Sequence, residues 1–288
     1  MSTSRRAEII IEALPFIRAF AGKTVVVKYG GNAMTDPALT TGVMQDLILM
    51  RLVGMLPVVI HGGGPQIDRA MKASGLTPRF IHGLRVTDAE TVRIVEQVLV
   101  GEINQAIVAE IGRLGGAAIG LSGKDGRLIR ARKAPPASLP DGHTADLGLV
   151  GEVASVEPRP VRTLLEAGYI PVVAPTAGDE AGQTYNINAD LVAGEVAAAL
   201  QAEKLVLLTD TDGILDRQGR LLSTLAREAV DRLVADGTIS KGMLPKVQAC
   251  LTALAGGVRK THIINGTRPH AVIEELLTAE GIGTEIIA

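Results

Sequence analysis

Residues 56–75, LPVVIHGGGPQIDRAMKASG, decide the fold, because they join a strand pattern to a helix pattern through three consecutive glycines. The β-branched run at 58–60 suits a buried strand, and Pro65 suits the first position of a helix. The glycines at 62–64 remove every Cβ where the backbone turns, so a ligand can approach the amides of a helix N-terminus. The turn favours an anion such as a carboxylate or a phosphate, and a tight turn without a ligand is the alternative.

The composition is typical of a soluble globular protein of one large or two modest domains. The chain has 288 residues, is 47% hydrophobic and carries a net charge of -2, so neither nucleic acid nor an anionic membrane surface is expected as a partner. The single Cys250 excludes an internal disulfide and a cysteine-based metal site, and it fits a reducing cytoplasm. No apolar run reaches the ~18 residues of a membrane helix, so we expect a cytoplasmic protein.

An amphipathic segment precedes the first strand pattern. Residues 5–20, RRAEIIIEALPFIRAF, place Ile10, Leu14 and Ile17 at helical spacing, and Pro15 predicts a kink. The apolar stripe packs either on its own domain or on another subunit, and the pattern leaves both open.

A lysine interrupts the first strand pattern. Residues 24–31, TVVVKYGG, predict a buried strand that ends at Gly30 and Gly31, with Lys28 in the apolar run. Burial of an ammonium group is costly without a counter-charge, so a phosphate partner is predicted for Lys28. The alternative is a lysine that reaches solvent at the strand end.

Arg85 lies in a short loop before a helix. Thr87, Asp88 and Glu90 form the pattern of a capping box, which predicts the start of that helix. The planar guanidinium of Arg85 either clamps a carboxylate or is solvated. Apolar spacing over residues 92–114 predicts a continuous core helix.

Residues 117–153 contain short runs between glycines and prolines, which predict hairpins that lie over the site. Residues 161–174 repeat a helix followed by a buried strand, and the second half of the chain begins there. Successive strand and helix patterns predict a mainly parallel sheet with helices on both faces and ligands at the carboxyl ends of its strands. Neither common nucleotide fingerprint is present, and Ile67 occupies the place of the third Rossmann glycine.

Residues 185–190, YNINAD, hold two polar side chains four positions apart. Asn186 and Asp190 share one helix face if the helix includes both, and the alternative is that Asn186 or Asn188 caps the helix.

Two later segments suggest phosphate chemistry. Residues 204–212, KLVLLTDTD, predict a strand that ends in threonine and aspartate residues suited to a nucleotide or to the waters of Mg²⁺. Lys246, one step after Pro245, lies at the opening of a helix, where it can reach a transferring phosphoryl group.

Six motifs in order, VVVKYGGN, VVIHGGGP, GLRVTD, YNINAD, LLTDTDGIL and GMLPKV, resemble the amino acid kinase family over nearly the whole chain. HGGGP together with GLRVTD is similar to the branch of that family that phosphorylates N-acetyl-L-glutamate. The resemblance implies an α/β fold, a three-layer αβα sandwich with a mainly parallel central sheet. It also implies an N-terminal oligomerisation helix (1–22), an N-lobe for acyl substrate and dimerisation (23–175), and a C-lobe for nucleotide and effector (176–288).

The implied reaction transfers the γ-phosphoryl group of ATP, with Mg²⁺, to the side-chain carboxylate of N-acetyl-L-glutamate in arginine biosynthesis. By this resemblance Lys28 and Lys246 are catalytic and Asp190 orients both, with no metal ligand from the protein. The implied substrate residues are Gly63, Gly64 and Arg85 at the α-carboxylate and Asn186 at the acetamido group or the nearby backbone. The implied phosphate and nucleotide residues are Gly30, Gly31, Thr209, Asp210, Asp212 and Gly213.

The N-terminal helix resembles that of the arginine-inhibited branch, which implies a homo-hexamer built as a trimer of dimers and feedback inhibition by L-arginine. The matching effector residues are Lys204, His262, Glu275, Gly281 and Gly283. Phe16 stands where that branch often has tyrosine, so a hydroxyl contact is missing. A PII-type regulatory protein is a further partner that the resemblance suggests.

Two other functions compete with this one. The first is a kinase of the same fold for another carboxylate acceptor. The second is a catalytically silent ligand-sensing module, against which the presence of Lys28, Asp190 and Lys246 argues, because such a module needs no lysine pair for a phosphoryl group.

Overall fold

Strands β1 (Thr24–Tyr29) and β2 (Leu56–His61) lie side by side, as their β-branched runs predict. They pair in parallel from Thr24↔Leu56 to Tyr29↔His61, so their carboxyl ends reach the same edge of the sheet. The computed structural model describes residues 3–81, 83–138 and 143–288.

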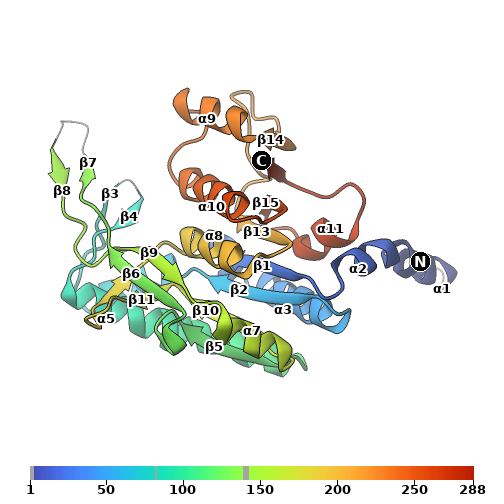
Figure 1. Ribbon diagram of the computed structural model, residues 1–288, viewed down its shortest axis with the longest axis horizontal. Coiled ribbons are helices and arrows are strands. Elements are labelled where there is room, and N and C mark those ends of the chain that lie inside the picture. The colour runs from blue at the N-terminus through green and yellow to red at the C-terminus, as the bar shows by residue number, and fades with distance from the viewer. Residues whose placement is uncertain (1–2, 82, 139–142) are drawn as a thin grey trace.

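Among the described residues, eight strands form the main sheet in the order β14-β16-β15-β13-β1-β2-β10-β5 (Figure 1). Within the described part of this sheet, β15 and β16 pair antiparallel and all other neighbouring strands pair in parallel. The mainly parallel sheet is therefore confirmed. Its other strands are β5 (Ala118–Ser122), β10 (Ile170–Ala174), β13 (Lys204–Thr209), β14 (Thr224–Ala226), β15 (Lys260–Asn265) and β16 (Thr284–Ile287).

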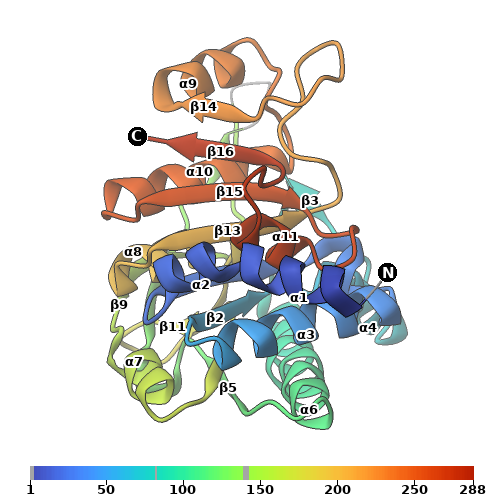
Figure 2. The ribbon, with the colours of Figure 1, turned by 90° about the vertical axis from the view of Figure 1, so that its right-hand side faces the viewer.

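Helices cover both faces of this sheet (Figure 2). Alternate side chains of β1 enter different cores. Val26 belongs to the core that holds buried residues of α7, α8 and α10, whereas Val25 and Val27 belong to the core that holds those of α3, α6 and α11. These helices are α3 (Pro37–Leu52), α6 (Gln105–Arg113), α7 (Arg159–Glu166), α8 (Ala189–Leu200), α10 (Met243–Ala255) and α11 (Ala271–Leu277). Both faces are thus buried, and the three-layer αβα arrangement is confirmed.

A second sheet has the strand order β12-β11-β6-β9 within the described part of the chain. Its strands are β6 (Ile129–Lys133), β9 (Gly151–Val156), β11 (Thr176–Gly178) and β12 (Thr184–Asn186). Two short hairpins accompany it: β3 (Phe80–Ile81) with β4 (Leu84–Arg85), and β7 (Ala137–Ser138) with β8 (Thr144–Ala145).

The prediction of hairpins for residues 117–153 is wrong at its start, because β5 joins the main sheet in parallel with β10. Gly120 lies in this strand and not in a turn. A Cβ on Gly120 would lie 1.9 Å from Oδ1 of Asn104, so the glycine makes room for the Asn104 side chain.

The long helix predicted up to residue 114 is interrupted by a π-helix. α5 (Ala89–Glu96) passes into the π-helical segment η2 (Gln97–Asn104), and α6 follows. The predicted capping box is also wrong in register. Asp88 is the N-cap, since its carboxylate accepts from the Thr91 amide at 2.8 Å, while the Thr87 hydroxyl donates to the Arg85 carbonyl.

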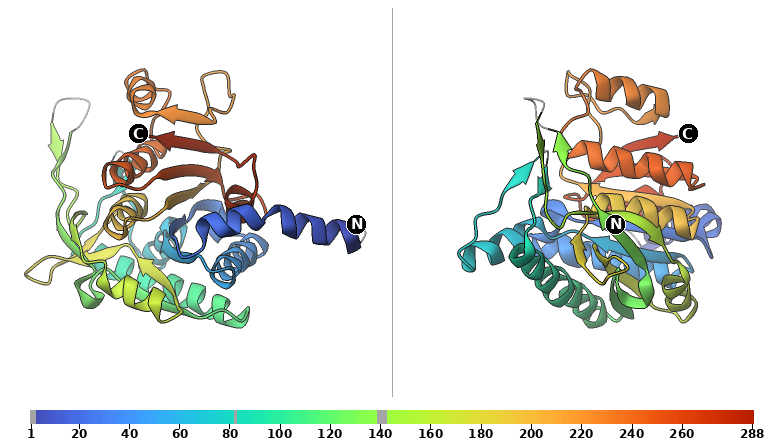
Figure 3. Two further views of the ribbon diagram at one scale, coloured as in Figure 1. Left: turned by 45° about the vertical axis from the view of Figure 1, so that its right-hand side comes forward. Right: turned by 60° about the vertical axis from the view of Figure 1, so that its left-hand side comes forward.

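The kink predicted at Pro15 is confirmed as a break between α1 (Thr3–Glu12) and α2 (Leu14–Phe20). α2 packs on the core, but α1 projects from the body of the molecule (Figure 3). Ile10 is 67% exposed and Leu14 is 45% exposed, so this part of the stripe does not pack on its own domain. Among the helices that the structure describes, none combines the length and apolarity needed to cross a bilayer.

Candidate active site

The carboxyl ends of β1 and β2 open onto a cavity of about 220 Å³. Glycine turns follow both strands, so the backbone rather than bulky side chains forms much of the wall. Residues predicted from the sequence that line this cavity are Lys28, Gly31, Gly63, Gly64, Arg85, Asn186 and Asp190.

Two lysines share one carboxylate beside this cavity. Nζ of Lys28 lies 3.0 Å from Oδ1 of Asp190, and Nζ of Lys246 lies 3.1 Å from Oδ1 and 2.9 Å from Oδ2. Lys28 comes from β1, Asp190 from the first turn of α8 and Lys246 from the first turn of α10. Lys28 is only 7% exposed, so the alternative of a solvent-reaching lysine is wrong.

The charges of this cluster are unbalanced. Burial alone raises the pKa of Asp190, but the positive charges of Lys28 and Lys246 outweigh burial and hold that pKa below its usual range. Burial and the neighbouring charge of Lys28 lower the pKa of Lys246, and Asp190 opposes them. One carboxylate therefore faces two ammonium groups, and the excess positive charge suits an added anion.

The first glycine turn lets the backbone approach this cluster. A Cβ on Gly30 would lie 2.8 Å from Nζ of Lys28, and Gly31 has a φ of +70° with Asp210 close behind it. A side chain at either position would displace the lysine or the aspartate. The turn therefore brings backbone amides close to the ammonium group of Lys28.

The second glycine turn opens helix α4 (Gly64–Ala73). The first amides of a helix have no partner within it. Among the backbone hydrogen bonds of the described residues, none is donated by the Gly63 amide. The Gly63 amide is therefore available to a ligand in the cavity that Gly63 lines, and the anion site at this turn stays a prediction.

Arg85 is 7% exposed and ion-paired, so the alternative of a solvated arginine is wrong. Its Nη1 donates to Oδ1 of Asp68 at 2.6 Å, and its Nη2 lies 3.3 Å from the Gly64 carbonyl oxygen. The guanidinium stacks on Phe80 of the β3–β4 hairpin, 4.7 Å from the ring centroid. These contacts hold its planar fork at the rim of the cavity.

The two asparagines of YNINAD have different positions. Asn188 is the N-cap of α8, and its Oδ1 accepts from the amides of Asp190 and Leu191. Asn186 ends β12, so the predicted shared helix face with Asp190 is wrong. Asn186 lines the cavity, and its Nδ2 lies 3.4 Å from Oγ1 of Thr87.

Thr209–Gly213 form a separate group at the carboxyl end of β13, outside the residues that line the cavity. Oδ1 of Asp210 accepts from the Asn32 amide at 2.8 Å, and Oδ1 of Asp212 accepts from Nδ2 of Asn265 at 2.8 Å. Each aspartate therefore already has a partner, and the Asp210 contact ties this loop to the first glycine turn.

The sequence matches the pattern of the Amino acid kinase family over residues 23–265. The chain belongs to the amino acid kinase family. It is 54% identical over 286 residues to the acetylglutamate kinase of Halorhodospira halophila, a match that covers 97% of this chain and 95% of the relative.

Solved structures of similar fold agree with this family. The N-acetylglutamate synthase from Neisseria gonorrhoeae, complexed with coenzyme A and N-acetyl-glutamate, has a TM-score of 0.84 at 30% identity. The match covers 98% of this chain but 63% of the synthase chain. The carbamate kinase from Giardia lamblia bound to AMP-PNP has a TM-score of 0.66 at 18% identity over 93% of this chain and 99% of that chain, and it supports the fold alone.

Three of the five residues predicted for the effector site, Lys204, His262 and Glu275, are in direct contact. Glu275 accepts from Nζ of Lys204 and from the Ile282 amide, and Nε2 of His262 lies 3.0 Å away. Burial raises the pKa of Glu275, but the His262 contact and the Lys204 charge outweigh burial and lower it to about 2. A Cβ on Gly281 would lie 3.0 Å from this carboxylate, and Gly283 approaches the backbone of β15. Both oxygens of Glu275 are thus already engaged.

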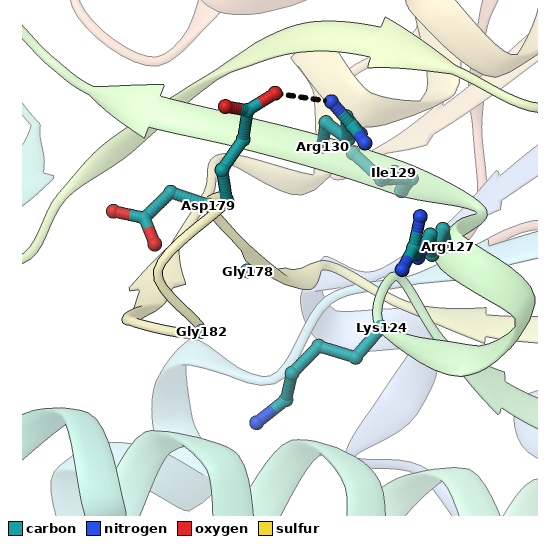
Figure 4. Close-up of a pocket in the computed structure, with 8 residues that line it drawn as sticks. Lys124, Arg127, Ile129, Arg130, Gly178, Asp179 and Gly182 are labelled. Atoms are coloured by element: carbon teal, nitrogen blue, oxygen red, sulfur yellow. Dashed lines mark hydrogen bonds and ion pairs between the residues drawn. The ribbon is translucent and has the colours of Figure 1, made fainter.

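A further cavity of about 250 Å³ lies apart from these residues (Figure 4). Its charged lining residues are Lys124, Arg127, Arg130, Asp179 and Glu180, and Figure 4 shows Asp179 across the cavity from Arg127. Arg130 pairs with Glu180, and Lys124 pairs with Glu96 outside the lining. None of the site residues predicted from the sequence lines this cavity.

Sequence reasoning missed the residues that act through others. Asp68 pairs with Arg85, Asn32 ties Asp210 to the glycine turn, and Asn104 contacts His61. His61 stands next to the triple glycine, which is the one signal that sequence offered. The other contacts join residues far apart in the chain, and no local pattern marks them.

Proposed function

We propose that the protein transfers the γ-phosphoryl group of ATP to the side-chain carboxylate of N-acetyl-L-glutamate, giving N-acetyl-L-glutamyl 5-phosphate and ADP in arginine biosynthesis. The observation that carries this proposal is the buried Lys28–Asp190–Lys246 cluster beside a cavity with glycine walls. The 54% identity to an acetylglutamate kinase supports the choice of acceptor.

The chemistry needs charge neutralisation more than proton transfer. A carboxylate acceptor is already ionised near pH 7, because an unperturbed glutamate has a pKa of about 4.3, so no base is needed to activate it. An oxygen of the carboxylate attacks the γ-phosphorus as the bond to the β-phosphate oxygen breaks, and ADP leaves. Lys28 and Lys246 oppose the repulsion between the two anions and stabilise the spreading charge.

Asp190 has a positioning role in this mechanism. Its two oxygens hold both ammonium groups, so that neither lysine has to be ordered when the substrates bind. The amides of Gly30 and Gly31 would bind phosphate oxygens. The group Thr209, Asp210, Asp212 and Gly213 would contact the rest of the nucleotide.

At the acceptor end, Arg85 and the amides of Gly63 and Gly64 would bind the α-carboxylate. Nη1 of Arg85 already donates to Asp68 and Nη2 to the Gly64 carbonyl oxygen, so the substrate would bind the remaining N–H groups of the guanidinium. Asn186 would bind the acetamido group or the backbone beside it. This arrangement selects an acceptor with two carboxylates, one held and one reactive.

ATP kinases of this kind usually act on the Mg²⁺ complex. Among the described residues, no group of three or more His, Cys, Asp and Glu side chains is placed to hold a metal. Mg²⁺ keeps water and phosphate oxygens as ligands more readily than protein cages, so the donor set fits an ion carried by ATP. When bound, the ion would neutralise phosphate charge beside Gly30 and Gly31.

A kinase for another acceptor is the second candidate, because a carbamate kinase shares the fold. An assay of ADP release with N-acetyl-L-glutamate, L-aspartate, L-glutamate, carbamate and UMP separates the two. We expect the rate of ADP release with N-acetyl-L-glutamate to be at least about tenfold above the rate with any other acceptor. A site that binds a charged substrate group discriminates against acceptors that lack it. Preferred turnover of another acceptor would replace the proposal, and no turnover of any would support the silent module.

The division into lobes at residues 23–175 and 176–288, with an oligomerisation helix at 1–22, is also proposed. The exposed Ile10 and Leu14 support an interface between subunits. The resemblance to the arginine-inhibited branch suggests that this interface builds a hexamer. L-arginine would bind near Lys204, His262, Glu275, Gly281 and Gly283 and would have to displace a contact of Glu275. A cytoplasmic location remains a prediction from the cysteine content and the apolar pattern, and a PII-type partner remains a prediction from the resemblance.

A further inference from the structure

His61, the last residue of β2, lies directly behind the second glycine turn. It has 0% exposed surface, and burial lowers its pKa to about 4, although the hydrogen bond to the Gly62 backbone opposes the shift. The imidazole is therefore neutral near pH 7, with one ring nitrogen protonated and the other free to accept.

The partners of the two ring nitrogens decide the tautomer. Nδ1 of His61 lies 2.9 Å from the Gly62 carbonyl oxygen, and a carbonyl only accepts, so Nδ1 carries the proton. Nε2 lies 3.2 Å from Nδ2 of Asn104, which donates to it. The same Nδ2 donates to the Val172 carbonyl oxygen at 2.9 Å, which fixes the orientation of the amide. Asn104 thus stabilises the Nδ1–H tautomer of His61.

The backbone of Gly62 is held on both sides. Its N–H donates to the Tyr29 carbonyl oxygen at 2.7 Å, and its C=O accepts from His61. The described residues contain no cis peptide bond, and in a trans peptide the C=O and the following N–H point in opposite directions. A Gly62 carbonyl that faces the buried imidazole therefore turns the Gly63 N–H toward the cavity that Gly63 lines.

We propose that His61 and Asn104 are positioning residues that aim the Gly63 amide at the α-carboxylate of the acceptor. The inference rests on the proposed function, which supplies that carboxylate. Neither side chain lines the cavity, so both act through the Gly62–Gly63 peptide. The opposite orientation of this peptide would present a carbonyl oxygen to the carboxylate and would repel it.

The π-helical segment η2 fixes this arrangement in space. Asn104 is its last residue, and Leu99 and Ile103 belong to the same segment. A Cβ on Gly63 would lie 2.7 Å from Cδ2 of Leu99 and 2.4 Å from Cδ1 of Ile103. One element therefore sets both the position of the turn and, through Asn104, the orientation of its peptide. π-Helical turns are rare and recur at functional sites.

The tautomer tests the geometry without any substrate. Nitrogen-15 NMR of the full-length protein with labelled histidine, with His61→Asn to assign the signal, distinguishes a protonated Nδ1 from a protonated Nε2. We expect the Nδ1–H form from pH 6 to 8. An Nε2–H form would overturn the proposal, because Nδ1 then has no proton to donate to the Gly62 carbonyl.

Two variants of His61 test the consequence for binding. In His61→Asn the side-chain amide nitrogen takes the place of Nδ1 and still donates to Gly62, whereas in His61→Gln the amide reaches the place of Nε2 and the donor is lost. We expect His61→Gln to raise the KM for N-acetyl-L-glutamate about tenfold or more, the effect of one misdirected hydrogen bond to a charged group. The kcat and the KM for ATP should stay within about threefold, and His61→Asn should stay within about threefold in all constants.

A purely structural role would reduce kcat and the affinity for both substrates together, or would affect both variants equally, and either result would overturn the proposal. Asn104→Leu is a second test, because it removes the donor to Nε2 and should reproduce the selective rise in KM. If the wild-type enzyme does not phosphorylate N-acetyl-L-glutamate, the proposed function fails by itself. The NMR result still decides the role of His61 in that case.

Discussion

Lys28 is the residue that links the sequence most directly to the chemistry. A lysine inside an apolar strand is costly to bury, and here Asp190 lies 3.0 Å from its ammonium group. Lys246 shares the same carboxylate, so the cluster keeps one unbalanced positive charge. We propose that anionic groups of the substrates balance this charge.

Removal of either lysine should therefore affect the transition state more than the fold. We expect Lys28→Ala and Lys246→Ala each to lower kcat, because each should raise the activation free energy by about 2.7 to 4 kcal/mol. This is the scale of one preorganised stabilising group. Steady-state kinetics measures the effect, with thermal unfolding as the control for the fold. A folded variant with unchanged kcat would exclude that lysine from the mechanism.

His61 makes stability depend on pH in a defined window. Its pKa is about 4 in the folded protein and about 6.5 in an unfolded chain, so the unfolded state binds more protons between these values. The contribution of neutral His61 to the free energy of unfolding is fully present above pH 6.5 and is lost as the pH falls toward 4. As the pH falls from 6.5 to 4, the free energy of unfolding should decrease by about 3 kcal/mol more in the wild-type protein than in His61→Asn. Urea unfolding measures this difference. Parallel curves for the two proteins would contradict this.

At the residue scale the sequence predicts charges and glycines but not their partners. Lys28 could be recognised because it interrupts an apolar strand pattern. Arg85 could be recognised because it lies in a short loop directly before a helix. Asp68 and Asn104 could not, because their contacts with Arg85 and His61 exist only after distant segments have packed.

At the element scale, the turn after β2 and the π-helical segment η2 form one unit. The apolar spacing of residues 92–114 predicts a helix but is too coarse to separate α from π geometry. The strand β5 was predicted as part of a hairpin because Gly120 resembles a turn signal, whereas this glycine makes room for Asn104. Tertiary packing overrides the local signal in both cases.

The contact between Gly63 and η2 predicts a substrate-specific defect. Gly63→Ala would place a methyl group against Leu99 and Ile103, whose ends have to move, and the turn would shift toward the cavity. We expect a rise of about tenfold in the KM for N-acetyl-L-glutamate with the KM for ATP unchanged. Gly101→Ala is the matched control, because nothing lies within 4 Å of a Cβ there. Equal kinetics for the two variants would show that the close contact has no effect on the site.

At the scale of the whole molecule, one sheet carries both proposed lobes, with β1 between β13 and β2. The alternation of strand and helix patterns predicts this sheet well, because both of its faces are buried. Helix α1 projects from the body of the molecule, and its apolar side chains, such as Ile10, are not covered by the rest of the chain.

Deletion of residues 1–20 should therefore change assembly and regulation together. We expect active dimers that ignore L-arginine, because the exposed Ile10 and Leu14 would no longer join neighbouring dimers. Light scattering and inhibition curves measure the two effects. The deletion also removes the contacts of α2, and Ile10→Glu in the full-length chain is the control for their loss. Ile10 is 67% exposed, so its replacement should leave the fold intact. A deleted protein that stays hexameric and fully inhibited would exclude this role of the helix.

The central claim is that the site makes an acyl phosphate from N-acetyl-L-glutamate and ATP with Lys28 and Lys246 as the charge carriers. Trapping the product with hydroxylamine measures this directly, because an acyl phosphate yields a hydroxamate and a phosphate ester does not. We predict hydroxamate that requires both substrates and the wild-type enzyme, and a loss of at least about a hundredfold in its rate in either lysine-to-alanine variant. ATP consumption without hydroxamate, or equal hydroxamate from wild type and both variants, would contradict the account.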